Sequence, residues 1–261
     1  HLVYAGNRSN EFEARLTGVS YETIANNGGG IVATVNATRQ ASFDALYQAS
    51  KNRLQAFLAQ GVATLEIKSG YGLDLDSERK MLQVACQLGQ DLGVTVQKTY
   101  LAAHAVPPEY QGNAKGYIAK VCEWLKILHS EGLVDAVDGF CETIAFSPDE
   151  IAQVFAVAKE LGLPVKLHAE QLSDSNGAGL VADFDGLSAD HIEYLSEPNI
   201  QKMASKNVVG VLLPTAFYTL RETKMPPIDL MRQYGVKMAV STDCNPGTSP
   251  STSLLLAMNM A

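Results

Sequence analysis

The sequence lacks the features that mark membrane, secreted and nucleic-acid-binding proteins. It contains no uncharged apolar run of about 18 residues, the length that a membrane-spanning helix requires. No basic segment followed by an apolar core opens the chain, as a secretion signal would. Positive charge is scarce, because 20 Lys and Arg residues stand against 28 Asp and Glu residues. The net charge of −8 therefore predicts neither a nucleic-acid nor an anionic-membrane partner.

Cysteine is also sparse, and its spacing suggests no disulfide framework. The four cysteines, Cys86, Cys122, Cys141 and Cys244, form no C-x-x-C pair. Proteins that keep their cysteines unpaired are typical of reducing compartments. We therefore expect a cytoplasmic protein.

A nucleotide-binding glycine loop is missing as well. The glycine-rich stretch "NNGGGI" at residues 26–31 lacks the G-x-G-x-x-G spacing and does not follow a strand directly. We interpret it as a loop. With 261 residues, 46% of them hydrophobic, the chain is long enough for one large α/β barrel or for two smaller domains.

Strand-like and helix-like segments alternate along the whole chain. The apolar strands suit a parallel sheet covered by helices, so the pattern predicts a (β/α)₈ TIM-type barrel as one catalytic domain over residues 1–261. Strands are expected within residues 1–6, 63–72, 94–107, 134–142, 164–170, 186–194, 207–215 and 236–243. Helices are expected from Tyr21 after a Ser20 cap, over 42–61, 76–93 and 114–132, from Ser147, and over 177–184, 196–205 and 228–234, with a last one at the end of the chain.

Both ends of the chain are expected to lie inside a longer protein. The chain begins at His1 without an initiator Met, and it stops within the apolar helical run "SLLLAMNMA".

Polar side chains gather where the expected strands end. Four of the five histidines lie there, and the strand "VKMAV" runs into Ser-Thr-Asp, ending at Asp243. Catalytic groups of a barrel come from these carboxyl ends. Imidazole nitrogens with one carboxylate and an open position are typical of a catalytic metal site, and a divalent cation offsets the cost of burying the carboxylate. The histidines are His1, His104, His168 and His191, and the other polar residues at strand ends are Lys68, Tyr71, Glu142 and Glu170.

The alternation of side chains along a strand adds a second expectation. Lys166, His168 and Glu170 should share one face of their strand. Ala239, Ser241 and Asp243 should likewise share a face of theirs. Both sets are expected to point toward the barrel axis.

Six separated motifs carry a family resemblance over nearly the whole chain. In their order and spacing they resemble the imidazolonepropionase family of the amidohydrolase superfamily. The motifs are "HLVYAGNR", "IKSGYGL", "TYLAAHAVP", "KLHAEQ", "SADHIEY" and "STDCNPGTSP".

The resemblance implies one divalent metal ion, zinc or iron. His1 would be the second histidine of a His-x-His pair whose first member precedes the chain, and His168 and Asp243 would complete the ligands. His191 would lie beside them as a catalytic group, and Glu170 is the nearest alternative carboxylate. Many relatives carry Glu where Gln171 stands, so Gln171 is expected to form hydrogen bonds only. The implied substrate contacts are Arg8 for a carboxylate, Tyr71 and His104 as neutral donors, and Gln171, Asn245, Gly247 and Thr248.

The implied reaction is the hydrolysis of 4-imidazolone-5-propanoate to N-formimidoyl-L-glutamate in histidine degradation. A metal-bound hydroxide would attack the cyclic amide, and Asp243 would carry the proton to the leaving nitrogen. The resemblance further implies a homodimer that acts on a small molecule, and a small flanking β domain formed largely outside this chain.

Three other functions remain open at this point. The first is another mononuclear amidohydrolase, either a cyclic-amide hydrolase or an aminohydrolase; the lack of lysine in residues 134–142 favours a single metal. The second is a Schiff-base aldolase that uses Lys68 or Lys166. The third is a barrel that binds a ligand without catalysis.

Overall fold

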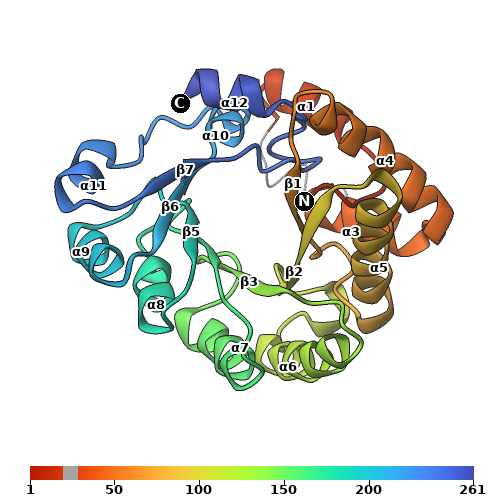
Figure 1. Ribbon diagram of the computed structural model, residues 1–261, viewed down its shortest axis with the longest axis horizontal. Helices are drawn as coiled ribbons and strands as arrows, with labels where there is room; N and C mark the ends of the chain where they lie inside the picture. The colour runs from red at the N-terminus through yellow and green to blue at the C-terminus, as the bar shows by residue number, and fades with distance from the viewer. Residues whose placement is uncertain (20–28) are drawn as a thin grey trace.

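The computed structural model describes residues 1–19 and 29–261, and in that part seven parallel strands pair in chain order to form a curled sheet. Helices surround the ring of strands on the outside, and the amino end of the chain lies near β1 (Figure 1). The strands are β1 Thr64–Lys68, β2 Thr95–Ala103, β3 Ala136–Cys141, β4 Leu167–Ala169, β5 Ser188–His191, β6 Val209–Leu212 and β7 Met238–Val240. This arrangement confirms the predicted barrel class.

Helices precede β1 and follow each of the strands β1 to β7. They are α1 Ser9–Leu16, α3 Ile31–Gln40, α4 Phe43–Leu58, α5 Leu75–Leu92, α6 Ala114–Ser130, α7 Pro148–Glu160, α8 Gly177–Asp183, α9 Glu197–Lys206, α10 Pro214–Leu220, α11 Ile228–Tyr234 and α12 Leu254–Met260, with a 3₁₀ turn at Pro108–Tyr110. None of the helices in the described residues is long and apolar enough to cross a membrane.

The first expected strand, at residues 1–6, differs from the prediction. Residues 1–4 of this segment are buried, yet the segment has no strand ladder. Its backbone groups bond to side chains instead: Arg53 donates to the carbonyls of Leu2 and Tyr4 at 2.6 and 2.9 Å, and Ala5 N–H donates to Thr38 Oγ1 at 3.1 Å. These bonds occupy groups that a neighbouring strand would otherwise use.

Three helices were not predicted, namely α1, α3 and α10. Pro214 at the start of α10 explains one of these misses, because proline suits the first helical turn as well as a loop. The start of the helix expected from Ser20, and the first half of "NNGGGI" (residues 26–28), lie outside the described residues.

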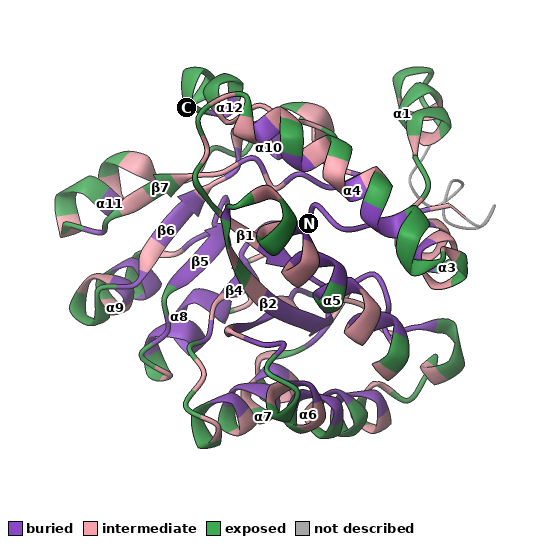
Figure 2. Ribbon diagram, turned by 45° about the vertical axis from the view of Figure 1, so that its right-hand side comes forward, coloured by how far each residue is buried: buried purple, intermediate pink, exposed green. Residues whose placement is uncertain are grey.

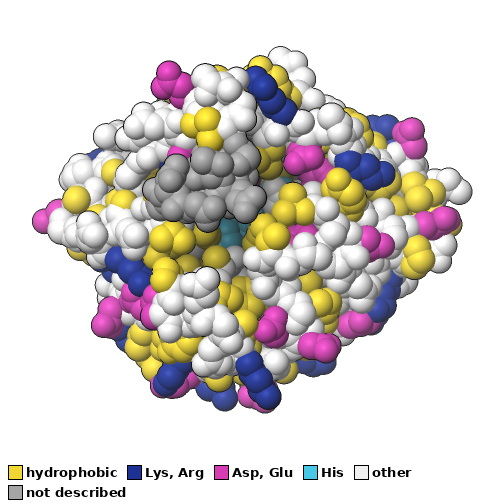
Figure 3. All heavy atoms as spheres, turned by 180° about the vertical axis from the view of Figure 1, so that it is seen from behind, with side chains coloured by type: hydrophobic (Ala, Val, Ile, Leu, Met, Phe, Trp, Pro, Cys, Tyr) yellow, Lys and Arg dark blue, Asp and Glu magenta, His cyan; other side chains and the backbone are white. Residues whose placement is uncertain are grey.

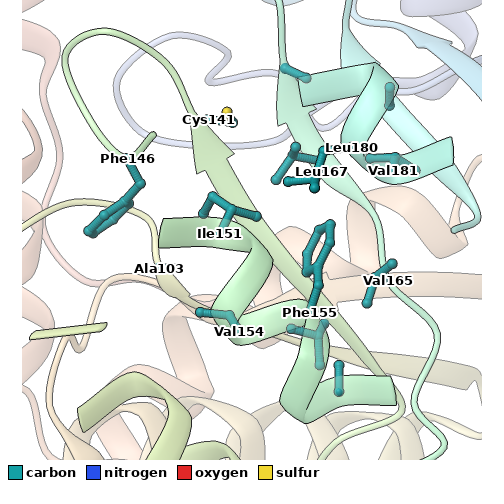
Figure 4. Packing of buried hydrophobic residues seen from close by; sticks show 14 of the residues in the cluster. Ala103, Cys141, Phe146, Ile151, Val154, Phe155, Val165, Leu167, Leu180 and Val181 are labelled. Carbon is teal, nitrogen blue, oxygen red and sulfur yellow. The ribbon is translucent and has the colours of Figure 1, made fainter. Parts of the chain in front are cut away.

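The apolar core fills the space between the strands and the outer helices. Buried residues line the inner side of helices such as α6, α7 and α8, as the purple surfaces in Figure 2 show. Ile151, Val154 and Phe155 of α7 lie over β3 and β4 near Val165 and Leu167 (Figure 4), and all five side chains are at most 3% exposed. This packing fixes α7 outside the sheet and leaves the inner face of the strands to polar residues.

The start of α7 offers a test of local helix stability. Ser147 and Glu150 form a capping box, in which each side chain accepts from the other residue's backbone N–H. Replacing Ser147 by alanine should lower the free energy of unfolding by about 1 kcal/mol, because it leaves a helix N–H without its acceptor. Thermal and urea unfolding would measure this loss. Ser9→Ala is the control, because Ser9 bonds only to the exposed Asn7 side chain, and it should leave stability nearly unchanged.

Candidate metal centre

Most residues of the predicted site lie at or after the ends of strands, and several have unusual backbones. Glu170, His191 and Asp243 have φ values of +52°, +82° and +58°, in the region that non-glycine residues seldom adopt. Each lies at or just past the last residue of a strand. Such conformations persist where the surrounding structure imposes them, and they concentrate at functional sites.

Two histidines and one carboxylate converge inside the ring. His1 Nε2 lies 2.9 Å from His168 Nε2 and 3.5 Å from Asp243 Oδ1. The three residues each offer a ligand atom within 4.8 Å of the others. A histidine is visible at the bottom of an opening bordered by hydrophobic side chains (Figure 3). The structure thus brings together the three predicted metal ligands.

A buried carboxylate fixes the orientation of His168. The Nδ1 atom of this imidazole lies 3.2 Å from Asp138, on β3. A carboxylate only accepts, so Nδ1 carries the proton and Nε2 presents a lone pair toward His1. Asp138 in turn accepts from the Lys68 ammonium. Although burial favours its neutral form, Lys68 and His168 hold the pKa of Asp138 well below its usual range.

Beneath the histidines, Lys68 belongs to a buried ionic network. Its Nζ lies 2.9 Å from Asp190 Oδ2, while Lys166 Nζ lies 2.9 Å from Glu66 and 3.4 Å from the same Asp190 oxygen. Burial lowers the affinity of Lys68 for its proton, but the surrounding carboxylates outweigh burial and raise its pKa well above the usual value. A charged lysine is a poor Schiff-base nucleophile, which argues against the aldolase alternative.

Burial shifts the pKa values of Asp243 and His191 in opposite directions. Burial raises the pKa of Asp243 to about 6. Burial lowers the pKa of His191 to about 3, and among the described residues its buried Nδ1 has no hydrogen-bond partner. His191 is therefore neutral at pH 7, with its ring centroid 5.5 Å from that of His168.

Tyr71 and His104 form an aromatic wall beside His1. The His104 ring stacks on His1 at a centroid distance of 5.3 Å, and Tyr71 lies 5.3 Å from His104. His104 Nδ1 lies 2.8 Å from the carbonyl of Gly70, so this nitrogen donates to the backbone. Burial lowers its pKa to about 4, which keeps the ring neutral. The Nε2 atom of His104 is consequently an acceptor, whereas the sequence analysis expected a donor.

The loop after β7 holds several predicted substrate contacts in place. The amide of Asn245 donates to Asp243 Oδ2 at 2.8 Å, and its oxygen accepts from the backbone N–H groups of Gly247 and Thr248 at 2.9 and 2.7 Å. A Cβ at Gly247 would lie 2.1 Å from the Arg8 guanidinium, so a larger residue there would displace the end of the Arg8 side chain. Arg8 also pairs with Glu11 at 2.8 Å and borders a cavity of about 390 Å³ that Gly247 also lines.

Glu170 lies away from the metal ligands. Its carboxylate accepts from the backbone N–H groups of Gly177 and Ala178, at 2.6 and 3.0 Å, at the start of α8. The left-handed backbone at Glu170 turns its side chain off the face that Lys166 and His168 share, so the expected alternation ends there. Burial raises its pKa to about 7. Gln171 follows it and is buried.

Comparisons with known proteins agree with these observations. A scan against models of known protein families gave no match. Curated proteins named imidazolonepropionase match all of the chain: that of Psychrobacter cryohalolentis is 62% identical over 260 residues, and that of Ralstonia nicotianae 65% over 262 residues. The whole chain is similar to the imidazolonepropionase family. It spans 61% and 64% of the length of these two relatives.

Among solved structures, 5-methylcytosine deaminase from Klebsiella pneumoniae liganded with phosphonocytosine has a TM-score of 0.72 with this chain. The match covers 100% of this chain and 66% of that one, at 13% sequence identity. At this identity the likeness shows the fold alone, and it confirms the barrel class. The similarity to imidazolonepropionases comes from the curated sequences.

The donor set of this chain fits one divalent cation. Lone pairs of ring nitrogens and a carboxylate oxygen are the ligands that zinc and iron accept. The hydrogen bond between His168 Nδ1 and Asp138 leaves Nε2 available to a metal ion, and the buried Nδ1 of His1 has no hydrogen-bond partner among the described residues. A cation bound by His1, His168 and Asp243 would offset the buried carboxylate.

Sequence reasoning missed the carboxylates of the buried network, namely Asp138, Asp190 and Glu66. Asp138 and Asp190 lie inside the apolar strands "VDAVDGFCE" and "SADHIEY". A carboxylate within such a strand needs a cation or several donors, because burying it alone is costly. That signal was present, but it did not identify Lys68 as the partner.

Proposed function

We propose that the protein containing this chain hydrolyses the cyclic amide 4-imidazolone-5-propanoate to N-formimidoyl-L-glutamate. The observation that carries the proposal is the convergence of His1, His168 and Asp243 in a chain 62–65% identical to two proteins named imidazolonepropionase. The metal is proposed to be zinc or iron. It would polarise the ring carbonyl as a Lewis acid and lower the pKa of water.

Asp243 is suited to move the proton of the reaction. With a pKa near 6, it is mostly ionised at pH 7 and so accepts a proton from the attacking water. It would then return that proton to the departing ring nitrogen. The 2.8 Å hydrogen bond from Asn245 holds the carboxylate in place during both transfers.

The remaining groups would position the substrate. His191, neutral at pH 7, would donate a hydrogen bond to the oxyanion. The Nε2 acceptor of His104 suits a ring N–H, and the phenol of Tyr71 stays protonated because burial raises its pKa well above the usual value. Arg8 offers a planar donor fork for the propionate.

The test is an ultraviolet assay of imidazolone disappearance with the full-length protein. Turnover should require metal, disappear after chelation and return when zinc or iron is added back. Metal-replete, folded protein that leaves the imidazolone intact would refute the proposal. A panel of other ring amides, run in parallel, would then identify a different cyclic-amide hydrolase.

Replacing Arg8 by methionine tests the propionate contact. We expect KM to rise roughly 10–100-fold, because a charge-assisted hydrogen bond is worth about 1.5–3 kcal/mol. The value of kcat should change little if Arg8 acts before the chemical step. Steady-state kinetics would separate the two constants. Arg79→Met is the control, because Arg79 pairs with Glu131 on the surface. A loss confined to kcat would contradict a positioning role for Arg8.

Compartment and assembly also belong to this proposal. The four cysteines are all unpaired in the structure, which supports a reducing cytoplasm. A homodimer acting on a small molecule is proposed from the family resemblance. Sedimentation of the full-length protein would measure its mass, and a monomer at micromolar concentration would reject the dimer.

A further inference from the structure

A second group of ligand-type side chains lies directly against the first and shares His168 with it. Asp138, His168 and Asp190 each offer a donor atom within 4.8 Å of the others. They come from the neighbouring strands β3, β4 and β5, and all three are buried. Two carboxylates this deep need a cation nearby.

Lys68 supplies that positive charge. Its Nζ contacts Asp138 Oδ2 and, at 2.9 Å, Asp190 Oδ2, so one ammonium links both carboxylates. Glu66 Oε1 lies 3.6 Å from the same nitrogen. Lys68 reaches this position from β1, across the interior of the ring, and its side chain is 9% exposed. An ammonium neutralises carboxylates as a metal ion does, but it offers no coordination positions.

The location of Lys68 is open to small solutes. A cavity of about 290 Å³ is lined by His1 and Asp243 of the first group and by Lys68, Lys166 and Asp190 of the network. A metal ion that enters this cavity meets both groups. Without Lys68, the carboxylates of the second group would attract the metal ion as strongly as the first group does. With Lys68 in place, their charge is already neutralised.

We propose that the Lys68 ammonium fills the position of a second metal ion and so limits this centre to one divalent cation. The inference rests on the proposed function, which takes a cation at His1, His168 and Asp243. The same arrangement explains the orientation of His168. Because Lys68 neutralises Asp138, this carboxylate continues to accept a hydrogen bond from His168 Nδ1. The Nε2 atom of His168 then stays free for the single metal ion.

Metal titration of the full-length protein tests the inference. After removal of metal by chelation, wild type should bind about one equivalent of Zn²⁺ or Mn²⁺ tightly, by calorimetry and by elemental analysis after gel filtration. Lys68→Met removes the ammonium while keeping most of the side-chain volume, and it should bind about two equivalents. The double variant Lys68→Met/Asp190→Asn loses a ligand of the second position and should return to about one.

Lys166→Met is the matched control. Lys166 belongs to the same network, but it pairs with Glu66 and Asp190 and leaves the Lys68 contacts with Asp138 and Asp190 in place. Its removal should leave the stoichiometry at about one equivalent. Two equivalents in Lys166→Met would show that any loss of positive charge suffices, and would overturn the specific role of Lys68.

The other outcomes are equally decisive. Folded Lys68→Met that binds a single equivalent rejects the inference. If Lys68→Met unfolds without metal, a divalent ion should restore its folding; failure to do so in both Lys68→Met and Lys68→Gln also rejects it. Wild type that hydrolyses imidazolone with two ions bound rejects the inference and leaves the proposed function standing. Wild type that binds no metal rejects both.

Discussion

Replacing Asp243 by asparagine is expected to lower kcat by about 10²–10⁴-fold, the usual contribution of a general acid–base group. Asparagine keeps the shape of the side chain and the contact with Asn245, but it accepts no proton. Its amide is also a weaker metal ligand than the carboxylate, so part of the loss will appear as lower metal affinity. Assays at saturating metal isolate the part that belongs to proton transfer.

Two measurements make this result interpretable. Circular dichroism and thermal unfolding should show that Asp243→Asn is folded, and elemental analysis should show that metal is bound under the assay conditions. Asp229→Asn, at a fully exposed carboxylate, should retain wild-type kcat. Near-normal turnover by Asp243→Asn would remove Asp243 from the mechanism and shift attention to another base.

The dependence of kcat/KM on pH should follow the ionisation of Asp243. Asp243 acts as a base only when ionised, and burial raises its pKa to about 6. Without another limiting group, kcat/KM should therefore fall as pH drops through the pKa of the free protein, and rise to a plateau above it. A bound cation favours the carboxylate, so the acidic limb is expected below pH 6 in the metal-loaded protein. Rates that do not change between pH 4 and 7 would contradict the role.

The sequence was sufficient to locate much of the fold and of this centre, for a physical reason. Alternating strands and helices specify parallel pairing, and parallel pairing brings strand ends together. His168 and Asp243 could therefore be placed near each other although 75 positions separate them in the sequence. The helix caps at Ser42 and Ser147 were equally local signals, and both are present in the structure.

What the sequence did not predict depends on backbone conformation and on long-range partners. Strand alternation assigned Glu170 to the face of His168, but a left-handed φ at Glu170 redirects it to α8. Lys68, Asp138 and Asp190 lie on three different strands, and no spacing along the chain reveals that they meet. The tautomer of His104 depends on a single carbonyl, that of Gly70.

Asp138→Asn should be the most damaging substitution outside the ligands themselves. Asparagine leaves the Lys68 ammonium without its closest carboxylate, and breaking a buried pair on one side costs about 3–5 kcal/mol of stability. It also loses the charged acceptor for His168 Nδ1–H, so metal affinity should fall roughly 10–100-fold. Urea unfolding of the metal-free protein and competition with a chelating dye would measure the two effects separately.

Asp135→Asn provides the comparison for Asp138, because the two residues lie three positions apart near the same strand. Asp135 pairs with Lys98 at 3.2 Å, and its side chain is 32% exposed. Water screens such a pair, so its loss should cost no more than about 1 kcal/mol and should leave metal affinity unchanged. If Asp138→Asn lost as little stability as Asp135→Asn and kept its metal affinity, the Asp138 carboxylate would have no role in positioning His168. A large effect on both would instead show that the ionic network sets the geometry and basicity of the metal ligand above it.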